Sequence, residues 1–395
     1  MRFRFFAHSW LSDWNHGNAH FLRGLTEALA RRGHEVRVYE EVPGPGGGWS
    51  LANLLTEPGG AAAIAQVRAA FPRMDLRFYG GGGPLHPALA ALGVPRVRSW
   101  REELRGAEWV IAHEWNPPEL FHWLLAQRQR HGFRCLLHDT HHRAVTEATM
   151  LERTPVAQFD GVLAFGESLR KRYAQAGAKR SFVFHEAADT GHFRPGAEAP
   201  TWDVAWIGNW GDEERTAELE EYLLGPVQRL GLRAQVFGVR YPAAAVERLQ
   251  ACGISFGGYL PNLAAPAVYA RAKVAVHIPR RPYAQALPGI PTIRVFEALA
   301  CGAALVCAPW NDCEALFEPG RDFASVADGA AMTAAVEQLI GQEEQRRQWS
   351  ARGAAAIAAR HTCAHRAQEL EAICQTISRE ARPDPAPICM SSAPA

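Results

Sequence analysis

The sequence predicts an α/β fold made of two domains of β/α/β units, and three observations support this prediction. The chain has 395 residues, enough for two domains of ordinary size that each bury a core. Apolar residues make up 48% of it, and its 35 glycines and 26 prolines supply many turns. Short apolar segments of strand length alternate with segments of helical periodicity, a pattern typical of parallel sheets covered by helices.

The charge balance argues against several classes of partner. The 42 basic and 41 acidic side chains leave a net charge of +1. Nucleic acids and anionic membranes bind concentrated basic surfaces, so we expect neither as a partner. No stretch approaches 18 uninterrupted apolar residues, and residues 1–6 are too short an apolar segment for a signal peptide. We therefore expect a cytoplasmic protein without stable membrane insertion. The eight cysteines lack the close pair spacing of zinc sites, and we expect reduced thiols.

The first β/α/β unit places a polar loop between a strand and a helix. Residues 3–8 are predicted to form a strand, residues 19–32 a helix with one apolar face, and residues 35–39 the next strand. The loop between the first strand and the helix contains Asp13 and His16. Its backbone N–H groups would face an anion or a hydroxyl at the helix start. The loop lacks a complete Gly-x-Gly-x-x-Gly pattern, so it does not predict a dinucleotide site.

The rest of the first half continues the alternation of strands and helices. A helix over residues 61–70 and a strand over 75–79 precede two compact apolar strands, 109–113 and 134–138, with a helix over 118–131 between them. A strand at 161–166, a helix at 167–175 and a strand at 181–185 follow. In open α/β sheets ligands bind beyond the carboxyl ends of the strands, so polar residues at these ends are the candidates for function.

The densest polar cluster follows the strand at 134–138. It contains His138, Asp139, His141 and His142. Three imidazoles and a carboxylate could bind a metal ion, but this spacing is not a standard ligand pattern. Two alternatives to a role in another kind of catalysis therefore remain open for these histidines. They could serve a metal-dependent hydrolase, or they could be ordinary satisfied or solvated side chains.

A linker of small, charged and proline residues at 196–201 predicts a domain boundary. The strand that begins at Trp202 runs into the turn Gly208-Asn209 and a charged helix containing Arg215, a geometry suited to phosphate. Strands are predicted at 233–239 and 254–260 with a helix at 242–252 between them, and a strand from Lys273 leads to Arg280 and Arg281. These two arginines form either a surface turn or half of a diphosphate clamp.

The helix at 291–302 carries Glu297 among apolar neighbours. Burial of a bare carboxylate is costly, so Glu297 requires a partner, such as Arg294 on the same helix, or a ligand. Helices over 327–340, 343–360 and 362–378 complete the pattern, and the Pro-rich tail after residue 380 is expected to be disordered.

Three segments resemble the GT-B glycosyltransferases, in particular the CgeB-like, spore-maturation-type subgroup related to glycosyltransferase family four. They are the first 40 residues, residues 202–215, and the stretch Arg294–Gly302 with the following Ala308-Pro309-Trp310 and residues 312–323. The resemblance implies two Rossmann-like domains that face a central cleft, with a C-terminal helix returning to the first domain. Residues 1–195 would form the acceptor side, residues 196–380 the donor side, and residues 381–395 the tail.

The resemblance also implies the roles of individual residues. Glu297 would bind the ribose of a nucleotide-sugar donor, and His141, favoured over His142, would contact the donor sugar. Donor binding would involve Gly208, Asn209, Arg215, Arg280, Arg281, Arg294 and Glu297, with the arginines neutralising the diphosphate.

The predicted function is transfer of a sugar from a nucleotide-diphosphate sugar to an unidentified acceptor, which could be a small molecule, a glycan, a lipid or a protein. The resemblance suggests retention of configuration and needs neither a metal ion nor another cofactor. An inverting reaction would need a base, and Asp13, His16 and Asp139 are the candidates. The wider family has a second glutamate at the position of Gly289, and its absence keeps open a catalytically silent nucleotide- or carbohydrate-binding protein.

Overall fold

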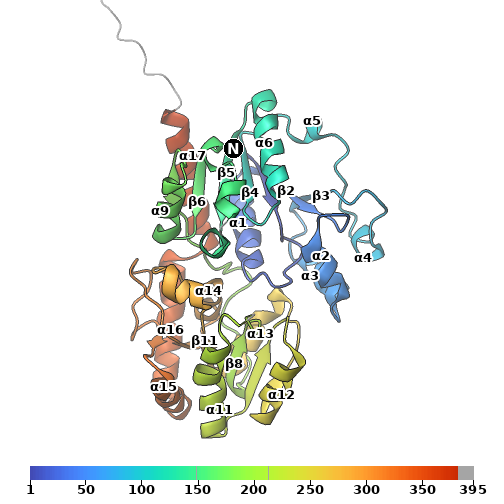
Figure 1. Ribbon diagram of the computed structural model, residues 1–395. Coiled ribbons are helices and arrows are strands. Elements are labelled where there is room, and N and C mark those ends of the chain that lie inside the picture. The colour runs from blue at the N-terminus through green and yellow to red at the C-terminus, as the bar shows by residue number, and fades with distance from the viewer. Residues whose placement is uncertain (148, 212, 381–395) are drawn as a thin grey trace, which may run out of the picture.

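The computed structural model describes residues 1–147, 149–211 and 213–380 and has two parallel sheets, each flanked by helices (Figure 1). The α/β class with two Rossmann-like domains is confirmed. The expected disordered tail, residues 381–395, lies outside the described residues.

The first sheet has seven parallel strands in the order β3-β2-β1-β4-β5-β6-β7. The strands are β1 (Arg2–Ala7), β2 (Glu35–Glu41), β3 (Asp75–Tyr79), β4 (Trp109–His113), β5 (Arg134–Asp139), β6 (Gly161–Ala164) and β7 (Ser181–Val183). The helices between them are α1 (Ala19–Arg31), α2 (Trp49–Thr56), α3 (Gly60–Ala70), α4 (Pro87–Ala90), α5 (Trp100–Glu103), α6 (Pro118–His131), α7 (Arg143–Thr146), α8 (Met150–Arg153) and α9 (Glu167–Gln175).

The second sheet has six parallel strands in the order β10-β9-β8-β11-β12-β13. The strands are β8 (Trp202–Ile207), β9 (Ala234–Phe237), β10 (Ile254–Phe256), β11 (Ala272–His277), β12 (Ala304–Cys307) and β13 (Ala324–Ser325). The accompanying helices are α10 (Thr216–Leu219), α11 (Gly225–Leu230), α12 (Ala243–Ala251), α13 (Ala265–Ala270), α14 (Ile293–Ala300), α15 (Gly329–Gly341), α16 (Glu343–Arg360) and α17 (Cys363–Glu380).

Most predicted elements are present within a few residues of their expected bounds. The strand at 75–79 and the helices at 118–131, 167–175 and 343–360 have the predicted bounds. Helix α2 was not predicted, because its start follows a Gly- and Pro-rich turn that indicated a loop. Strand β10 ends at Phe256, before the two glycines that follow it, so residues 257–260 are a loop that reaches the other domain.

The two faces of the first sheet pack against different helices. Phe3 and Phe5 belong to the apolar cluster that contains buried residues of α1 and α17, whereas Phe6 packs with residues of α6 and α9. This alternation follows from the period of two along a strand. The cluster around α1 also includes Val295 and Phe296 of α14, so one apolar core runs across the junction between the two sheets.

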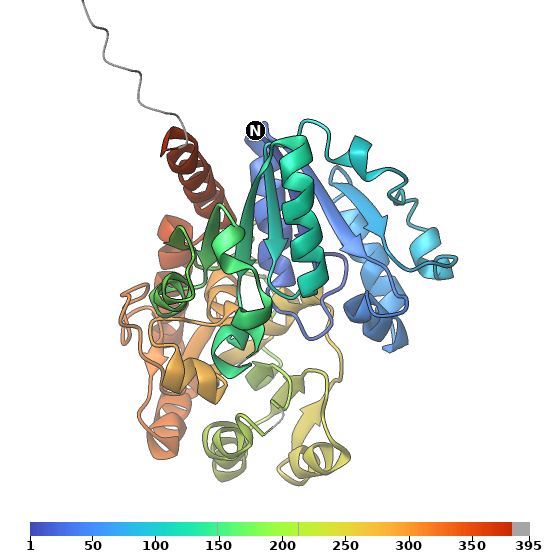
Figure 2. The ribbon, with the colours of Figure 1, turned by 45° about the horizontal axis from the view of Figure 1, so that its top comes forward.

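Helix α17 returns to the first sheet, as expected of this fold. It packs against α1, and Figures 1 and 2 show it alongside the first sheet, while α16 lies beside the second. The Glu371 carboxylate accepts hydrogen bonds from Arg32 at 2.6 Å and 2.7 Å and contacts His34 Nε2 at 2.6 Å. The C-terminal end of the described chain therefore fastens the second half of the molecule to the first.

Each sheet reverses its strand order at one point. In the first sheet this point lies between β1 and β4, and in the second it lies between β8 and β11. The loops that leave such neighbouring strands diverge to opposite sides and leave a crevice beyond the strand ends. The fold therefore predicts a ligand site where the loops after β1 and β4 face those after β8 and β11.

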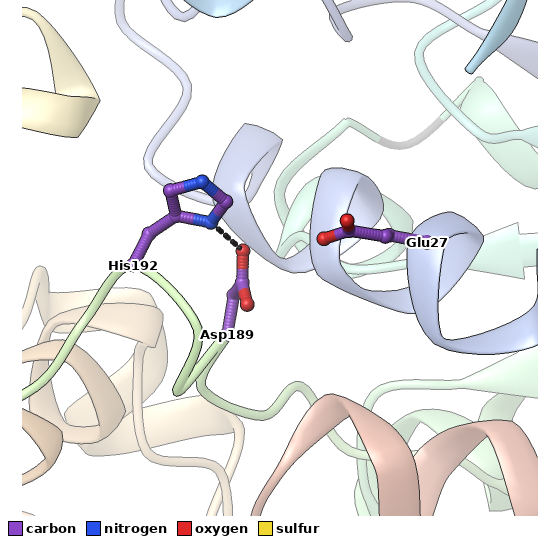
Figure 3. Close-up of side chains that lie close together, drawn as sticks. All are labelled: Glu27, Asp189 and His192. Atoms are coloured by element: carbon purple, nitrogen blue, oxygen red, sulfur yellow. Dashed lines mark hydrogen bonds and ion pairs between the residues drawn. The ribbon is translucent and has the colours of Figure 1, made fainter. Parts of the chain in front are cut away.

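A small cluster of potential metal ligands lies at the crossing between the domains, away from these loops (Figure 3). Ligand atoms of Glu27 on α1 and of Asp189 and His192 lie within 4.8 Å of one another. His192 Nδ1 is 2.7 Å from Asp189 Oδ2, and this hydrogen bond raises the pKa of His192. The ion pair between Asp189 and His192, in the segment that connects β7 to β8, accounts for this arrangement.

None of the helices in the described ranges is long and apolar enough to cross a membrane.

The link between α17 and the first domain should contribute pH-dependent stability. The hydrogen bond from Arg32, followed by the one from His34, lowers the pKa of Glu371 to about 2 against the opposing effect of burial. A carboxyl with a depressed folded-state pKa stabilises the fold above its unfolded pKa and loses this contribution as pH falls toward the folded value. We expect Glu371→Gln to reduce the unfolding free energy by about 1 kcal/mol at pH 7 and by less below pH ~4.5.

Urea unfolding of the two proteins at pH 7 and pH 3.5 measures this difference. An equal loss of stability at both pH values would show that the Glu371 charge is not involved.

Candidate functional site

A cavity of about 220 Å³ lies between the two domains, at the place where their strand orders reverse. The first domain contributes the loop after β1 and the residues that follow β4 and β5. The second domain contributes the loops after β8, β9, β10 and β11 and the start of α14. The polar and aromatic lining residues are Asp13, Asn15, His16, Trp115, His141, Asn209, Arg215, Arg240, Tyr259, Arg280, Tyr283, Thr292 and Arg294.

Buried charged residues fix the loop after β1. Glu40 on β2 accepts hydrogen bonds from the backbone N–H groups of Leu11 at 2.6 Å and Ser12 at 3.2 Å. Burial raises the pKa of Glu40 to about 7, although these bonds oppose the shift. Arg23 on α1 donates to the carbonyl oxygens of Trp10 at 2.6 Å and Leu11 at 3.1 Å. The loop is therefore held rigidly from both flanking elements.

Asp13 joins this loop to the second domain. Its Oδ1 accepts a hydrogen bond from the Tyr259 hydroxyl, and its Oδ2 accepts one from the backbone N–H of Asn262 at 3.0 Å. The same Oδ2 lies 3.3 Å from Arg23 Nη1. Nearby, Asn209 donates from its side-chain amide to Asn15 Oδ1. Asp13 lines the cavity, but both of its oxygens are engaged in holding the domains together.

The second domain presents an arginine whose environment favours an anion. Arg215 Nη1 and Nη2 donate to the backbone oxygens of Ile278 at 3.0 Å and Asn209 at 2.7 Å. Its Nε has no hydrogen-bond partner among the described residues. Burial, with a further contribution from the neighbouring Arg280, lowers the pKa of Arg215 to about 9. A bound anion would reverse this destabilisation of the charge.

Two further guanidiniums line the same cavity. Arg280 donates to Glu214 Oε2 at 2.7 Å and to the side-chain oxygen of Asn209 at 2.9 Å. Arg294 is paired with Glu297 on α14. Gly208 and Asn209 form the turn next to Arg215, so the sequence-predicted phosphate turn and three of the predicted arginines meet at one surface. This arrangement suits a diphosphate.

The first domain supplies neutral imidazoles. Burial, followed by the charge of Arg143, lowers the pKa of His16 to about 3. Burial, followed by the neighbouring His142, lowers the pKa of His141 well below its ordinary range. Neutral imidazoles can accept or donate a hydrogen bond to a hydroxyl. His141 lines the cavity, whereas His142 binds Thr146 Oγ1 at 2.9 Å, so the structure brings the favoured histidine of the pair to the site.

Three predicted residues do not line the cavity. Arg281 points outward and donates to Glu218 Oε1 at 2.7 Å, so the expected pair of clamping arginines is divided, and only Arg280 faces the cavity. Asp139 is fully buried and accepts hydrogen bonds from the Tyr173 hydroxyl at 2.7 Å and the backbone N–H of His141 at 2.8 Å. Asp139 therefore fixes the position of His141 rather than facing a substrate.

Glu297, the third of these residues, is completely buried at the domain junction. Its Oε1 contacts His20 Nδ1 at 3.0 Å and accepts a hydrogen bond from the Asn262 side chain at 3.0 Å. Its Oε2 is paired with Arg294. Burial would raise the pKa of Glu297, but Arg294 and the hydrogen bond from His20 outweigh it and keep the pKa below the ordinary value. The salt bridge to Arg294, expected as the alternative to a ligand, is present.

A larger side chain at Gly289, where the family that the chain resembles has a glutamate, would be strained. The φ of Gly289 is +88°, and a Cβ placed on it would lie 2.5 Å from Glu314 Oε1. Its backbone N–H donates to the backbone oxygen of Asn311 at 2.6 Å, so this amide is engaged within the protein. The loop is therefore shaped around Glu314.

Sequence reasoning missed several residues of the cavity. Asn15 lies in the loop after the first strand, where the sequence singles out only Asp13 and His16, and Tyr259 falls in the strand predicted at 254–260. Tyr283 follows the two arginines in a single π-helical turn, η4 (Pro282–Ala286). The only signal for Tyr259 is its place after a glycine pair at the end of a strand. No periodicity in the sequence indicates that these loops meet.

Asp13 should act as a structural link rather than as a base. The Asp13 carboxylate and the Arg23 guanidinium are both almost fully buried, and loss of one member of such a pair leaves the other charge uncompensated. We expect Asp13→Asn to lower the unfolding free energy by about 3 kcal/mol, measured by urea unfolding. The exposed pair between Arg2 and Glu108 provides the control, because Glu108→Gln should change the stability by less than about 1 kcal/mol. Full stability of Asp13→Asn combined with lost activity would instead indicate a base.

Comparisons with known proteins agree with this description of the fold. The model of a glycosyl transferase-like family matches residues 215–372, a segment that contains Arg215, Arg280, Arg294 and Glu297. No relative was found among curated proteins.

Three similar solved structures illustrate the likeness. The first is sucrose-phosphate synthase from Thermosynechococcus elongatus, with 14% sequence identity, a TM-score of 0.67, and coverage of 96% of this chain and 100% of that chain. The second is Anabaena HepE in complex with UDP-glucose, at 12% identity and a TM-score of 0.61, covering 95% and 100%. The third is the DNA-modifying enzyme β-glucosyltransferase, studied with and without uridine diphosphoglucose, at 13% identity and a TM-score of 0.54, covering 96% and 100%. The chain therefore has the GT-B fold, and residues 215–372 match a glycosyl transferase-like family.

Proposed function

We propose that this protein transfers a sugar from a nucleotide-diphosphate sugar, bound in the cavity between the domains, to an acceptor that enters from the first-domain side. The observation that carries the proposal is the environment of Arg215. Its guanidinium has a pKa lowered to about 9 and an Nε without a hydrogen-bond partner in the described part of the chain, and two further arginines line the same cavity. A polyanion would stabilise this group of charges.

The same charges explain how the site would accelerate the reaction. When the bond between the anomeric carbon and the diphosphate oxygen breaks, negative charge develops on the departing diphosphate. Arg215, Arg280 and Arg294 line the cavity in fixed positions, so they stabilise this charge without reorganisation during the reaction. The turn at Gly208 and Asn209 lies beside them and would hold the same group.

Glu297 supports the donor site through Arg294. In the present arrangement the carboxylate is enclosed, and a direct hydrogen bond to a ribose hydroxyl requires Arg294 to move aside. Its other partners, His20 and Asn262, come from α1 and from the loop before α13, so Glu297 also contributes to domain closure.

The first-domain wall fits transfer with retention of configuration. Of the three candidate bases, Asp13 is engaged across the domains and Asp139 does not line the cavity. His16 lines the cavity, but its pKa of about 3 makes it a weak base at neutral pH. In a retaining transfer the acceptor proton can pass to the departing phosphate oxygen, and His141 needs only to bind a sugar hydroxyl.

The proposal requires no metal ion, since the arginines supply the positive charge. UDP-glucose is the first donor to test, because the HepE structure contains it. A glycosyltransferase should slowly hydrolyse its proper donor and release the nucleoside diphosphate, and addition of a chelator should not change the rate. A catalytically silent binding protein would bind the donor without releasing the diphosphate, and a metal-dependent hydrolase would stop with the chelator.

Arg215 should be essential for donor binding. We expect Arg215→Ala to weaken the affinity for UDP-glucose about 10- to 100-fold, because charge-assisted hydrogen bonds to the diphosphate are lost. The matched control is Arg281→Ala, which removes an arginine of the same domain that does not line the cavity. Titration calorimetry of both variants measures the effect. Equal affinity of Arg215→Ala and wild type would remove the basis of the proposal.

A further inference from the structure

A side chamber of about 110 Å³ adjoins the main cavity at the first-domain side. The two share lining residues from both domains, namely Asn15, His16, Gly17, His141, Tyr283, Thr292 and Ile293. The residues that line the chamber alone are Asn18, Thr140, Phe165 and Glu186. A ligand held by the arginines of the main cavity therefore has space to extend into the chamber.

Glu186 has an unusual place in this chamber. Glu186 lies in the segment between β7 and β8 that connects the two domains, and it is only 1% exposed. Its Oε1 is buried and has no hydrogen-bond partner in the described part of the chain. An unsatisfied buried carboxyl oxygen is costly, so its presence beside a cavity indicates a ligand.

The protonated state that burial favours for Glu186 suits a ligand hydroxyl rather than a cation. Burial, followed by the charge of Glu297, raises the pKa of Glu186 well above its ordinary range, and Arg294 opposes this shift only in part. The protonated carboxyl can donate one hydrogen bond and accept others. No lysine or arginine lines the chamber among the described residues, so it offers no charge for a phosphate.

The remaining walls match the two kinds of surface on a sugar ring. Asn18 and Thr140 line the chamber and are hydrogen-bonded to each other, and His113, which does not line it, lies 2.9 Å from Thr140 Oγ1 through its Nε2. Phe165 provides an apolar surface. A ring with hydroxyls at its edge and C–H groups on its faces uses both.

We propose, resting on the function proposed above, that this chamber binds the sugar to be transferred and that Glu186 hydrogen-bonds one of its hydroxyls. Glu186 thereby distinguishes sugars that place a hydroxyl toward it from epimers that do not.

The test compares the affinities for a nucleotide sugar and for its free diphosphate. We expect Glu186→Ala to bind UDP within twofold of wild type, because UDP does not reach the chamber. Its affinity for UDP-glucose should fall about tenfold. The ratio of its affinities for UDP-glucose and UDP-galactose should move toward one. Glu186→Gln, which keeps the size of the side chain and a donor and an acceptor, should restore most of the UDP-glucose affinity. The affinities for GDP-glucose and GDP, and for ADP-glucose and ADP, are measured in the same way.

The matched control is Glu114→Gln. Glu114 is equally buried, has side-chain oxygens without hydrogen-bond partners in the described ranges, and has a pKa raised by burial, yet it lines neither chamber nor cavity. It should leave both affinities unchanged, and melting temperatures without ligand verify the folding of each variant.

The outcomes separate the inference from the function on which it rests. If wild type binds none of the nucleotide sugars, the proposed function fails. If wild type binds and hydrolyses a donor but Glu186→Ala keeps the wild-type ratio of sugar nucleotide to diphosphate affinity, only the role of Glu186 is wrong. A loss of UDP affinity equal to the loss of UDP-glucose affinity would equally overturn it, since that result indicates a structural role.

Discussion

The cavity depends on the hydrogen bonds that fasten the loop after β1 to the second domain. Asp13 binds Tyr259 and the backbone of Asn262, and Asn15 binds Asn209 in the turn beside Arg215. Buried Arg23 and Glu40 hold the loop from the first domain, so it is fixed on both sides. These bonds help to hold the histidines of one domain and the arginines of the other around the same cavity. The apolar cluster that runs from α1 to α14 stabilises the same junction.

The distribution of charge across this junction divides the cavity into regions of different chemistry. The second domain contributes guanidiniums, and burial, followed by repulsion from Arg280, lowers the pKa of Arg215. The first domain contributes imidazoles that burial keeps neutral, aromatic rings, and a carboxyl whose pKa is raised. A ligand with an anionic end and a neutral, hydroxylated end satisfies both regions, and a nucleotide-diphosphate sugar has this form.

The sequence predicted the fold and many of the residues that line the cavity, but not the contacts that connect them. Strand and helix periodicity predicted most strands and most of the longer helices, but not α2 or short helices such as α4 and α5. The rule for strand carboxyl ends directed attention to Gly208, Arg215 and Arg280, which line the cavity, and the resemblance added His141. Periodicity does not determine which way a side chain in a loop points, so it could not separate Arg280 from Arg281. The sequence also does not predict contacts between distant segments. Examples are the hydrogen bond from Tyr259 to Asp13 and the packing of Glu314 against Gly289, which only the folded chain shows.

The most direct measurement of the central claim is a crystal structure of the protein with UDP-glucose. The account predicts diphosphate density beside Arg215 and the turn at Gly208, with the glucose ring in the side chamber within hydrogen-bond distance of Glu186. Diphosphate density away from these arginines would contradict the proposed donor site. A glucose ring that points toward Trp115 and leaves Glu186 without a contact would contradict the assignment of the chamber.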